Sequence, residues 1–183
     1  LAIRLEAALH MAEQKTPKIV GQLESLMCKV NPQLHPLFPQ FFALIGTHES
    51  IRALSKLLLH KDEKVRVQAI ISAANHERDD LLPIIQKLAT HQSPMQQEAC
   101  AMALGKMKDE SSILKLEMLA KSNSKNVQLA ALYALYNLGQ KTKQQEIENM
   151  ARTLDLYAIQ MLFEMDESIK SLEELVKHED FSV

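Results

Sequence analysis

The apolar and polar positions of this chain follow one pattern in six successive segments, and five of these segments recur at a spacing of about 31 residues. We call the first position of each segment its anchor. The anchors are Ile3, Leu34, Val65, Gln96, Val127 and Leu154, and the last of them comes early. The fourth, seventh, eighth and eleventh positions after an anchor are mainly apolar and share one face of an α-helix with it. We call this predicted helix the B helix of its segment.

A second apolar stretch follows each B helix and predicts another helix, which we call the A helix of the next unit. Its apolar residues stand at the seventeenth and twentieth positions after the anchor, as in Val20 with Leu23 and Ile51 with Leu54. Neither helix can bury its apolar face alone, so each pair must stack on its neighbours. The predicted order is one B helix, five A/B pairs and a final A helix around Ser168–His178.

Helix-start signals precede the B helices. Side chains that cap helix N-termini stand three positions before four of the anchors, at Asn31, Asp62, Ser93 and Ser124. Proline follows the cap at Pro32 and Pro94, where it loses no helical hydrogen bond. Pro39 stands five positions after its anchor, which predicts a kink or break in the second B helix.

A fixed period of this length is typical of helical repeat proteins. The predicted fold is all-α: an α-α superhelix, in the form of a right-handed solenoid of helix pairs, with residues 1–183 as a single domain. The chain begins with an unpaired B helix and ends with an unpaired A helix, so we predict that it is a fragment of a longer protein. The alternative is that both half-repeats are true caps, which need polar outer faces.

Charge and cysteine content narrow the range of partners. The net charge of −2 gives no broad basic field, so we predict no nucleic-acid partner. No apolar run reaches the roughly 18 residues of a membrane span, so we predict no membrane partner. Two cysteines, Cys28 and Cys100, are too few for a disulfide framework and indicate reduced thiols in a cytoplasmic protein. We expect a monomer in solution that binds a protein or peptide partner.

The B-helix pattern also carries a family resemblance. The motif Val-x-x-Ala-Ala-x-x-Ala-Leu-x-x-Leu-Gly occurs at Val127–Gly139 and in part at Glu98–Asp109 and Val65–Ala69. With alternating helices and this short period, the chain resembles the HEAT-like repeat family, in particular its short, lyase-type repeats. The resemblance covers essentially the whole chain. It implies a solenoid but no single function, because that family includes scaffolds, adaptors and a few enzymes.

The residues that would support catalysis are missing from their expected positions. One enzymatic relative, deoxyhypusine hydroxylase, binds two irons through His-Glu dipeptides, and this chain has such dipeptides at His48, His76 and His178. In that relative the dipeptide stands at the second and third positions after the anchor, where no copy in this chain has histidine. No glycine-rich phosphate loop, nucleophile elbow or Cys-x-x-Cys motif occurs either. We therefore predict a non-enzymatic protein without a metal or cofactor.

The remaining candidate is the concave face, which B helices line in the family that this chain resembles. The second, sixth and ninth positions after an anchor point away from the buried face, and many are apolar: Leu5, Leu9, Val67, Ile71, Met102, Leu129, Tyr133, Tyr136, Leu156 and Phe163. Exposed patches rich in Tyr, Phe and Met are typical of partner sites. The predicted site has its strongest cluster at Leu129, Tyr133, Tyr136, Leu156 and Phe163, joined by Met102, Val67 and Ile71, with Gln97, Gln128 and Asn137 at the rim.

These observations predict an interaction scaffold or adaptor that binds a partner segment in the groove between B helices. Two other functions remain open: an accessory domain of a lyase-type or other HEAT-repeat enzyme, and a purely structural spacer. A further alternative concerns the apolar positions alone, because tight curvature of the solenoid would bury them between neighbouring B helices.

Overall fold

The computed structural model describes residues 2–15, 18–91, 93–153 and 155–165, which form eleven α-helices and three short 3-10 helices. The B helices are α1 (Ala2–Glu13), α3 (Phe38–Ile45), α5 (Glu63–Asn75), α7 (Pro94–Lys106), α9 (Lys125–Asn137) and α11 (Leu156–Phe163). The A helices are α2 (Ile19–Lys29), α4 (His48–Leu58), α6 (Leu82–Leu88), α8 (Ile113–Leu119) and α10 (Lys143–Ala151). The 3-10 helices are η1 (Pro32–Leu37), η2 (Asp79–Leu81) and η3 (Glu110–Ser112). The predicted order of one B helix and five pairs is confirmed, and the final A helix predicted around Ser168–His178 lies outside the described residues.

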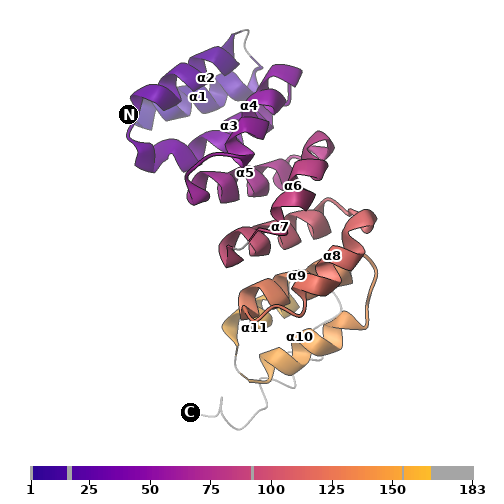
Figure 1. Cartoon of the computed structure of the whole chain (residues 1–183). Helices are drawn as coiled ribbons and strands as arrows, with labels where there is room; N and C mark the ends of the chain where they lie inside the picture. Colours follow the sequence, from indigo (N-terminus) through magenta and orange to yellow (C-terminus); the bar gives the residue numbers. More distant parts are fainter. Residues whose placement is uncertain (1, 16–17, 92, 154, 166–183) are drawn as a thin grey trace, which may run out of the picture.

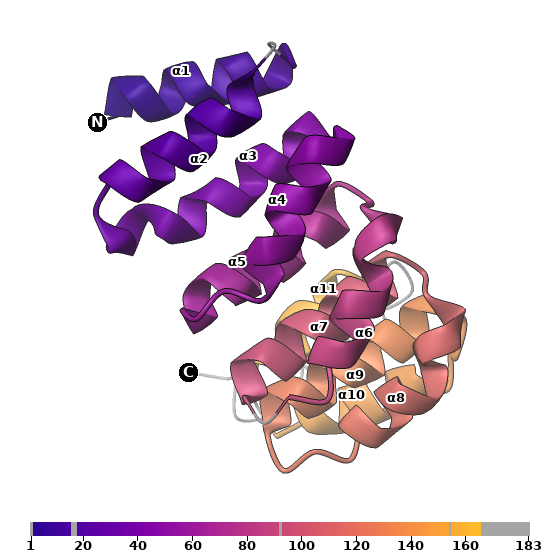
Figure 2. The same ribbon diagram turned by 45° about the horizontal axis from the view of Figure 1, so that its top comes forward.

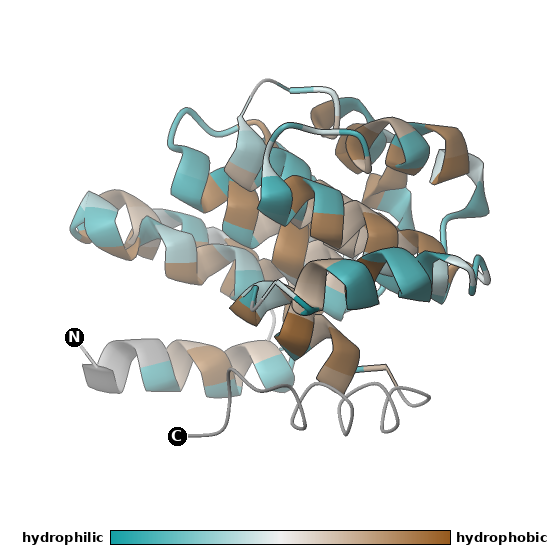
Figure 3. Cartoon of the chain, turned by 90° about the horizontal axis from the view of Figure 1, so that it is seen from below, coloured by the Kyte–Doolittle hydropathy of each residue, from teal (hydrophilic) through white to brown (hydrophobic). Residues whose placement is uncertain are grey.

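The helix pairs stack into the predicted α-α superhelix. Each B helix from α3 to α9 packs against the next B helix, and each A helix packs against B helices of its own or adjoining pair. Figure 1 shows the pairs following one another from α1 and α2 at the top to α10 and α11 at the bottom, and Figure 2 shows α4, α6 and α8 in front of the B helices. One continuous apolar core therefore runs between the two layers. Figure 3 shows brown, hydrophobic segments mainly where helices face one another.

The predicted N-caps explain where the B helices begin. The side chains of Asn31, Asp62 and Ser93 accept hydrogen bonds from backbone N–H groups of the first turn, at 2.9, 2.9 and 3.3 Å. Ser124 also occupies an N-cap position with extended backbone, but its side chain makes no capping hydrogen bond. Asp62 and Ser93 are thus confirmed as caps of the B helices α5 and α7. Asn31 instead caps the 3-10 helix η1 that precedes α3, and Ser124 is confirmed in position only.

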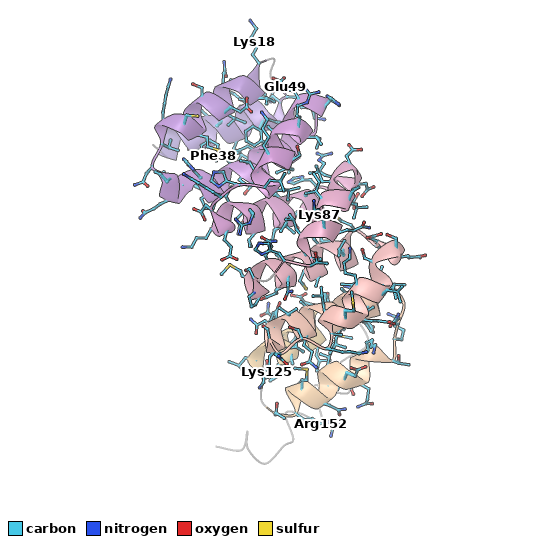
Figure 4. The ribbon with its side chains drawn as sticks, in the orientation of Figure 1. Lys18, Phe38, Glu49, Lys87, Lys125 and Arg152 are labelled. Carbon is cyan, nitrogen blue, oxygen red and sulfur yellow. The ribbon has the colours of Figure 1, made fainter. Side chains whose placement is uncertain are left out.

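The predicted break in the second B helix is present. Residues Pro32–Leu37 form the 3-10 helix η1, and the α-helix begins only at Phe38, with Pro39 in its first turn. Proline is tolerated there because the first N–H groups of a helix have no intrahelical acceptor. Phe38 and Phe42 are almost completely buried, and Figure 4 shows Phe38 among the packed helices whereas Lys18 points away from them.

Two long polar side chains join neighbouring repeats. Gln96 is a polar anchor where other repeats have an aliphatic residue, and it is fully buried. Its amide is satisfied, since it accepts a hydrogen bond from Arg66 Nε at 2.8 Å and donates one to the Leu88 carbonyl at 3.1 Å. Arg78 donates from Nε at 2.8 Å to the Ala43 carbonyl, which places a cation at the C-terminal end of α3.

The loop between α7 and α8 is held by Asp109. Its carboxylate accepts hydrogen bonds from Gln86 on α6 at 2.7 Å and from the Ser111 and Ser112 hydroxyls at 2.6 and 2.5 Å. Partial burial alone would raise the pKa of Asp109, but the hydrogen bonds from Ser111, Ser112 and Gln86 outweigh it and lower the pKa. The charged form of Asp109 therefore stabilises this junction between repeats.

Asp109→Asn is expected to lower the free energy of unfolding at neutral pH, and this loss is expected to shrink at acidic pH. The pKa of Asp109 is lower in the folded protein than the value of 3.8 for an unperturbed aspartate. Its stabilisation is thus fully present above that value and is lost as the pH falls through the folded-state pKa. Urea titrations of both proteins from neutral pH downward measure the difference. A difference that stays constant across the acidic range would contradict a role for the Asp109 charge.

Candidate functional site

A cavity of about 610 Å³ lies on the B-helix side of the solenoid. Residues of four B helices and the α11 C-cap line it: Val67, Ile71, Ala74 and Asn75 from α5; Met95, Glu98, Ala99, Met102, Ala103 and Lys106 from α7; Tyr133 and Asn137 from α9; Tyr157 from α11 and Glu164 just after it. Its volume is in the range of about 300–1,000 Å³ that is typical of ligand pockets. Half of the lining side chains are apolar, and the other half carry a polar group.

The lining residues recur at equivalent positions of successive repeats. Ile71, Met102 and Tyr133 each stand six positions after an anchor and form one row across α5, α7 and α9. Ten positions after an anchor stand the polar residues Asn75, Lys106, Asn137 and Glu164. Two of these are in direct contact, because Lys106 Nζ donates a hydrogen bond to Asn75 Oδ1 at 2.8 Å. The cavity is therefore a product of the repeat, with an apolar row beside a polar one.

Tyr157 connects α11 to α7 across the cavity. Its hydroxyl donates a hydrogen bond to Glu98 Oε1 at 2.9 Å, over a sequence separation of 59 residues. Burial is the main cause that raises the pKa of Tyr157, and the hydrogen bond to Glu98 and the nearby carboxylates of Glu98 and Glu164 raise it further. The phenol thus stays protonated and acts as a donor that fixes the position of the Glu98 carboxylate.

Tyr133 on α9 interacts in a similar way with Glu164, the C-cap residue of α11. Burial is again the main cause that raises its pKa, opposed by a hydrogen bond with Asn137 and assisted by the Glu164 carboxylate. The two tyrosines therefore belong to two Tyr–Glu pairs, each joining α11 or its C-cap to an earlier B helix. All four residues line the cavity.

Five of the predicted site residues come together in this cavity: Val67, Ile71, Met102, Tyr133 and Asn137. Their exposure decreases from Ile71, at 36% exposed, to Val67, at 8%. Of the other apolar positions considered, Leu9 is half-buried against the core, and the side chain of Leu5 lies outside the described part of the chain. The apolar row six positions after the anchor is the part of the predicted groove that the structure reproduces best.

Leu129 and Tyr136 were expected at the centre of the exposed cluster, and this expectation of exposure is wrong. Leu129 is 0% and Tyr136 5% exposed, and the Lys141 ammonium lies 3.7 Å from the centre of the Tyr136 ring. The reason is the close packing of the B helices. Gly105, nine positions after its anchor, faces Ala134 on the next B helix, and a Cβ on Gly105 would lie 2.6 Å from Ala134 Cα. At Gly105, position nine therefore belongs to the contact between α7 and α9, and the buried Tyr136 at the same position of α9 does not line the cavity.

The other predicted residues do not line the large cavity. Leu156 and Phe163 are highly exposed, at 80% and 71%, on α11, the last B helix that the structure describes. Gln97 borders a smaller cavity of about 270 Å³ beside α8, and Gln128 is half-buried on α9. The predicted polar rim therefore retains only Asn137, with Asn75, Lys106 and Glu164 as its further members.

Sequence reasoning missed several residues of the cavity, namely Met95, Glu98, Lys106, Tyr157 and Glu164. A signal for two of them existed, since Lys106 and Glu164 share the tenth position after the anchor with Asn75 and Asn137. Polar residues at one position in four successive repeats indicate a common solvent-facing row. No such signal existed for Tyr157, whose contact with Glu98 spans two repeats.

The described side chains of His, Cys, Asp and Glu form no group of three or more that could hold a metal ion. None of the helices in the described part of the chain is long and apolar enough to cross a membrane. Cys28 is exposed and Cys100 is buried, and both are free thiols. Burial raises the pKa of the Cys100 thiol to about 12, against a weaker lowering effect of Lys115, so this thiol is unreactive at neutral pH.

Stacked helix pairs with a groove on the B-helix side define a helical repeat protein of the kind that interacts with partners. The sequence model for HEAT repeats matches residues 51–136, from within α4 to near the end of α9, so the predicted resemblance is confirmed for this part of the chain. The fold is also shared with a solved structure of the complex of CpcE and CpcF of phycocyanin lyase from Nostoc sp. PCC7120. That comparison has a TM-score of 0.61 and 17% identity, and covers 96% of this chain and 88% of the other. A search of curated proteins finds no match.

Proposed function

We propose that this protein is a non-enzymatic scaffold or adaptor that binds a segment of a partner protein in the groove between its B helices. The observation that carries the proposal is the cavity of about 610 Å³, to which α5, α7, α9 and α11 all contribute. Its apolar wall includes Met95 and Ile71, which are 50% and 36% exposed. Exposed methionine and aliphatic side chains next to a polar rim are typical of surfaces that accept an apolar segment of a partner.

The comparison with the phycocyanin lyase complex supports protein binding in general terms. That structure is a complex of two proteins, so a chain with this fold assembles with a protein partner. The cavity among α5, α7, α9 and α11 supports the groove as the proposed place of binding.

The test replaces the two exposed apolar residues of the groove, Ile71→Gln with Met95→Gln, and compares the double variant with a matched control. The control carries Leu59→Gln and Leu114→Gln, two leucines that are 66% and 76% exposed and do not line the cavity. Both variants are expected to keep the wild-type stability to within about 0.5 kcal/mol, because the changes are on the surface. We expect partner capture from source-cell lysate, measured by quantitative mass spectrometry, to fall about tenfold or more for the groove variant alone.

Equal capture by the wild type, the groove variant and the control would contradict a groove site and favour a site elsewhere. Absence of any captured protein would favour the spacer. The remaining alternative, an accessory domain of a lyase-type enzyme, rests on the shared fold with a chain of the phycocyanin lyase complex. A visible absorbance band in the purified protein, from a bound pigment or iron centre, would favour that alternative.

A further inference from the structure

The polar groups of the cavity are unequal in their remaining hydrogen-bonding capacity. The Tyr157 hydroxyl donates to Glu98, and Tyr133 interacts with Glu164 and Asn137. A phenol has one proton to donate, so neither tyrosine has a second donor for a ligand. A carboxylate has about four acceptor positions, and Tyr157 occupies only one of those on Glu98. Glu98 therefore has acceptor positions left in the cavity for a donor group of a ligand.

The charges of the lining favour a cationic donor. Two carboxylates, of Glu98 and Glu164, and one ammonium, of Lys106, face the cavity. Lys106 is exposed at the rim, donates to Asn75 and lies eight positions after Glu98 on α7, which is about 12 Å along the helix at about 1.5 Å per residue. Glu98 is half-buried, so a cation beside it is screened less than one on the open surface.

The apolar wall lies next to the same carboxylate. Met95 and Met102 stand on α7 three positions before and four positions after Glu98, which places them on the same face of the helix. Ile71 from α5 borders the same cavity. An occupant that fills the cavity thus meets apolar side chains on both sides of the point where it meets Glu98.

We propose that the groove recognises a peptide segment in which an arginine or lysine is flanked by apolar residues, with the basic side chain bound to Glu98. This inference rests on the proposed function and names the chemistry of the partner. Glu98 accepts the cation, Tyr157 is a positioning residue that holds the carboxylate toward the cavity, and Met95, Met102 and Ile71 bury the flanking apolar side chains.

The probe is a displayed library of random dodecapeptides, selected on the wild-type chain, on Glu98→Gln and on Lys106→Gln. Wild type is expected to enrich peptides with arginine or lysine next to apolar residues. Glutamine keeps an acceptor for Tyr157 but removes the charge, so the Kd of the enriched peptides is expected to rise about tenfold with Glu98→Gln. Lys106→Gln removes a charge of opposite sign from the same helix and is expected to leave the Kd unchanged or lower it. Circular dichroism checks that each variant is folded, and Glu164→Gln provides a second acidic variant.

The outcomes separate the two proposals. In one outcome, peptides bind the wild type and Glu98→Gln equally but lose affinity for the Ile71→Gln, Met95→Gln variant. That result would contradict recognition of a basic residue by Glu98 and would still support binding in the groove. Enrichment of acidic peptides whose Kd is raised by Lys106→Gln would also contradict recognition of a basic residue. Peptides that bind all variants equally, or a library that yields no specific peptide, would contradict both recognition of a basic residue and binding in the groove.

Discussion

Gly105→Ala is expected to lower the free energy of unfolding by about 1–3 kcal/mol, although alanine is the better helix former by about 1 kcal/mol. Gly105 lies in the last turn of α7 and is buried against α9. A Cβ at this position would lie 2.6 Å from both Cα and Cβ of Ala134. The obstructing atoms belong to the backbone region of α9, so they cannot rotate away, and the two B helices must separate. Urea denaturation measures the loss.

The matched control is Gly21→Ala, also within a helix. Gly21 is exposed on α2, and a Cβ there would meet no atom within 4 Å. This change is expected to raise the free energy of unfolding by about 0.5–1 kcal/mol, because alanine loses less backbone entropy than glycine. The two substitutions thus have the same chemistry and opposite expected signs. Similar stabilisation by both would mean that α7 and α9 do not approach as closely as described.

The fold was predictable because the repeat specifies it several times over. Apolar positions of α9 such as Val127, Ala131 and Leu135 are all fully buried, as their shared helix face requires. Caps and prolines mark the same helix starts independently of the apolar pattern. Gln96 is the instructive exception, since a polar anchor interrupts the apolar pattern. Its burial depends on Arg66 and the Leu88 carbonyl, partners that no period along the chain indicates.

The site was predictable only where it follows the repeat. Ile71, Met102 and Tyr133 share one position and do line the cavity, whereas Tyr136 is buried and does not line it. The sequence period gives the direction of a side chain relative to its own helix axis. The distance and rotation of the next helix decide whether a side chain in that direction reaches solvent or packs against that helix. Gly105 at the equivalent position was a local sign of close approach.

Contacts that cross more than one repeat could not be predicted from the period. The last anchor, Leu154, follows Val127 after a shorter interval than the one between the other anchors, so the regular spacing that places the other B helices does not place α11. The hydrogen bond from Tyr157 to Glu98 bypasses α9 altogether. Glu98 itself occupies a position that is apolar in several other repeats, and its role depends on that distant tyrosine. The acidic character of the groove therefore emerges only from the three-dimensional arrangement.

Leu129→Ala is expected to lower the free energy of unfolding by about 2–5 kcal/mol, whereas Leu156→Ala is expected to change it by less than about 0.5 kcal/mol. Both leucines stand two positions after the anchor of adjacent B helices, and they differ in exposure, 0% for Leu129 and 80% for Leu156. Removing the buried side chain leaves a cavity between packed helices, while removing the exposed one leaves only water in its place. Thermal and urea denaturation of the two variants measure the difference.

The same pair separates a structural role from a binding role. If Leu129 acts only through the core, Leu129→Ala lowers partner capture in proportion to the unfolded fraction, and capture per folded molecule stays at the wild-type value. At a temperature where Leu129→Ala and Leu156→Ala are both folded, neither is therefore expected to lose as much partner capture as the Ile71→Gln, Met95→Gln variant. A loss of capture by folded Leu156→Ala would instead extend the binding surface to the exposed face of α11, where Phe163, 71% exposed, is its neighbour two turns along the helix. Similar stability of the two leucine variants would contradict the burial of Leu129 and return it to the groove.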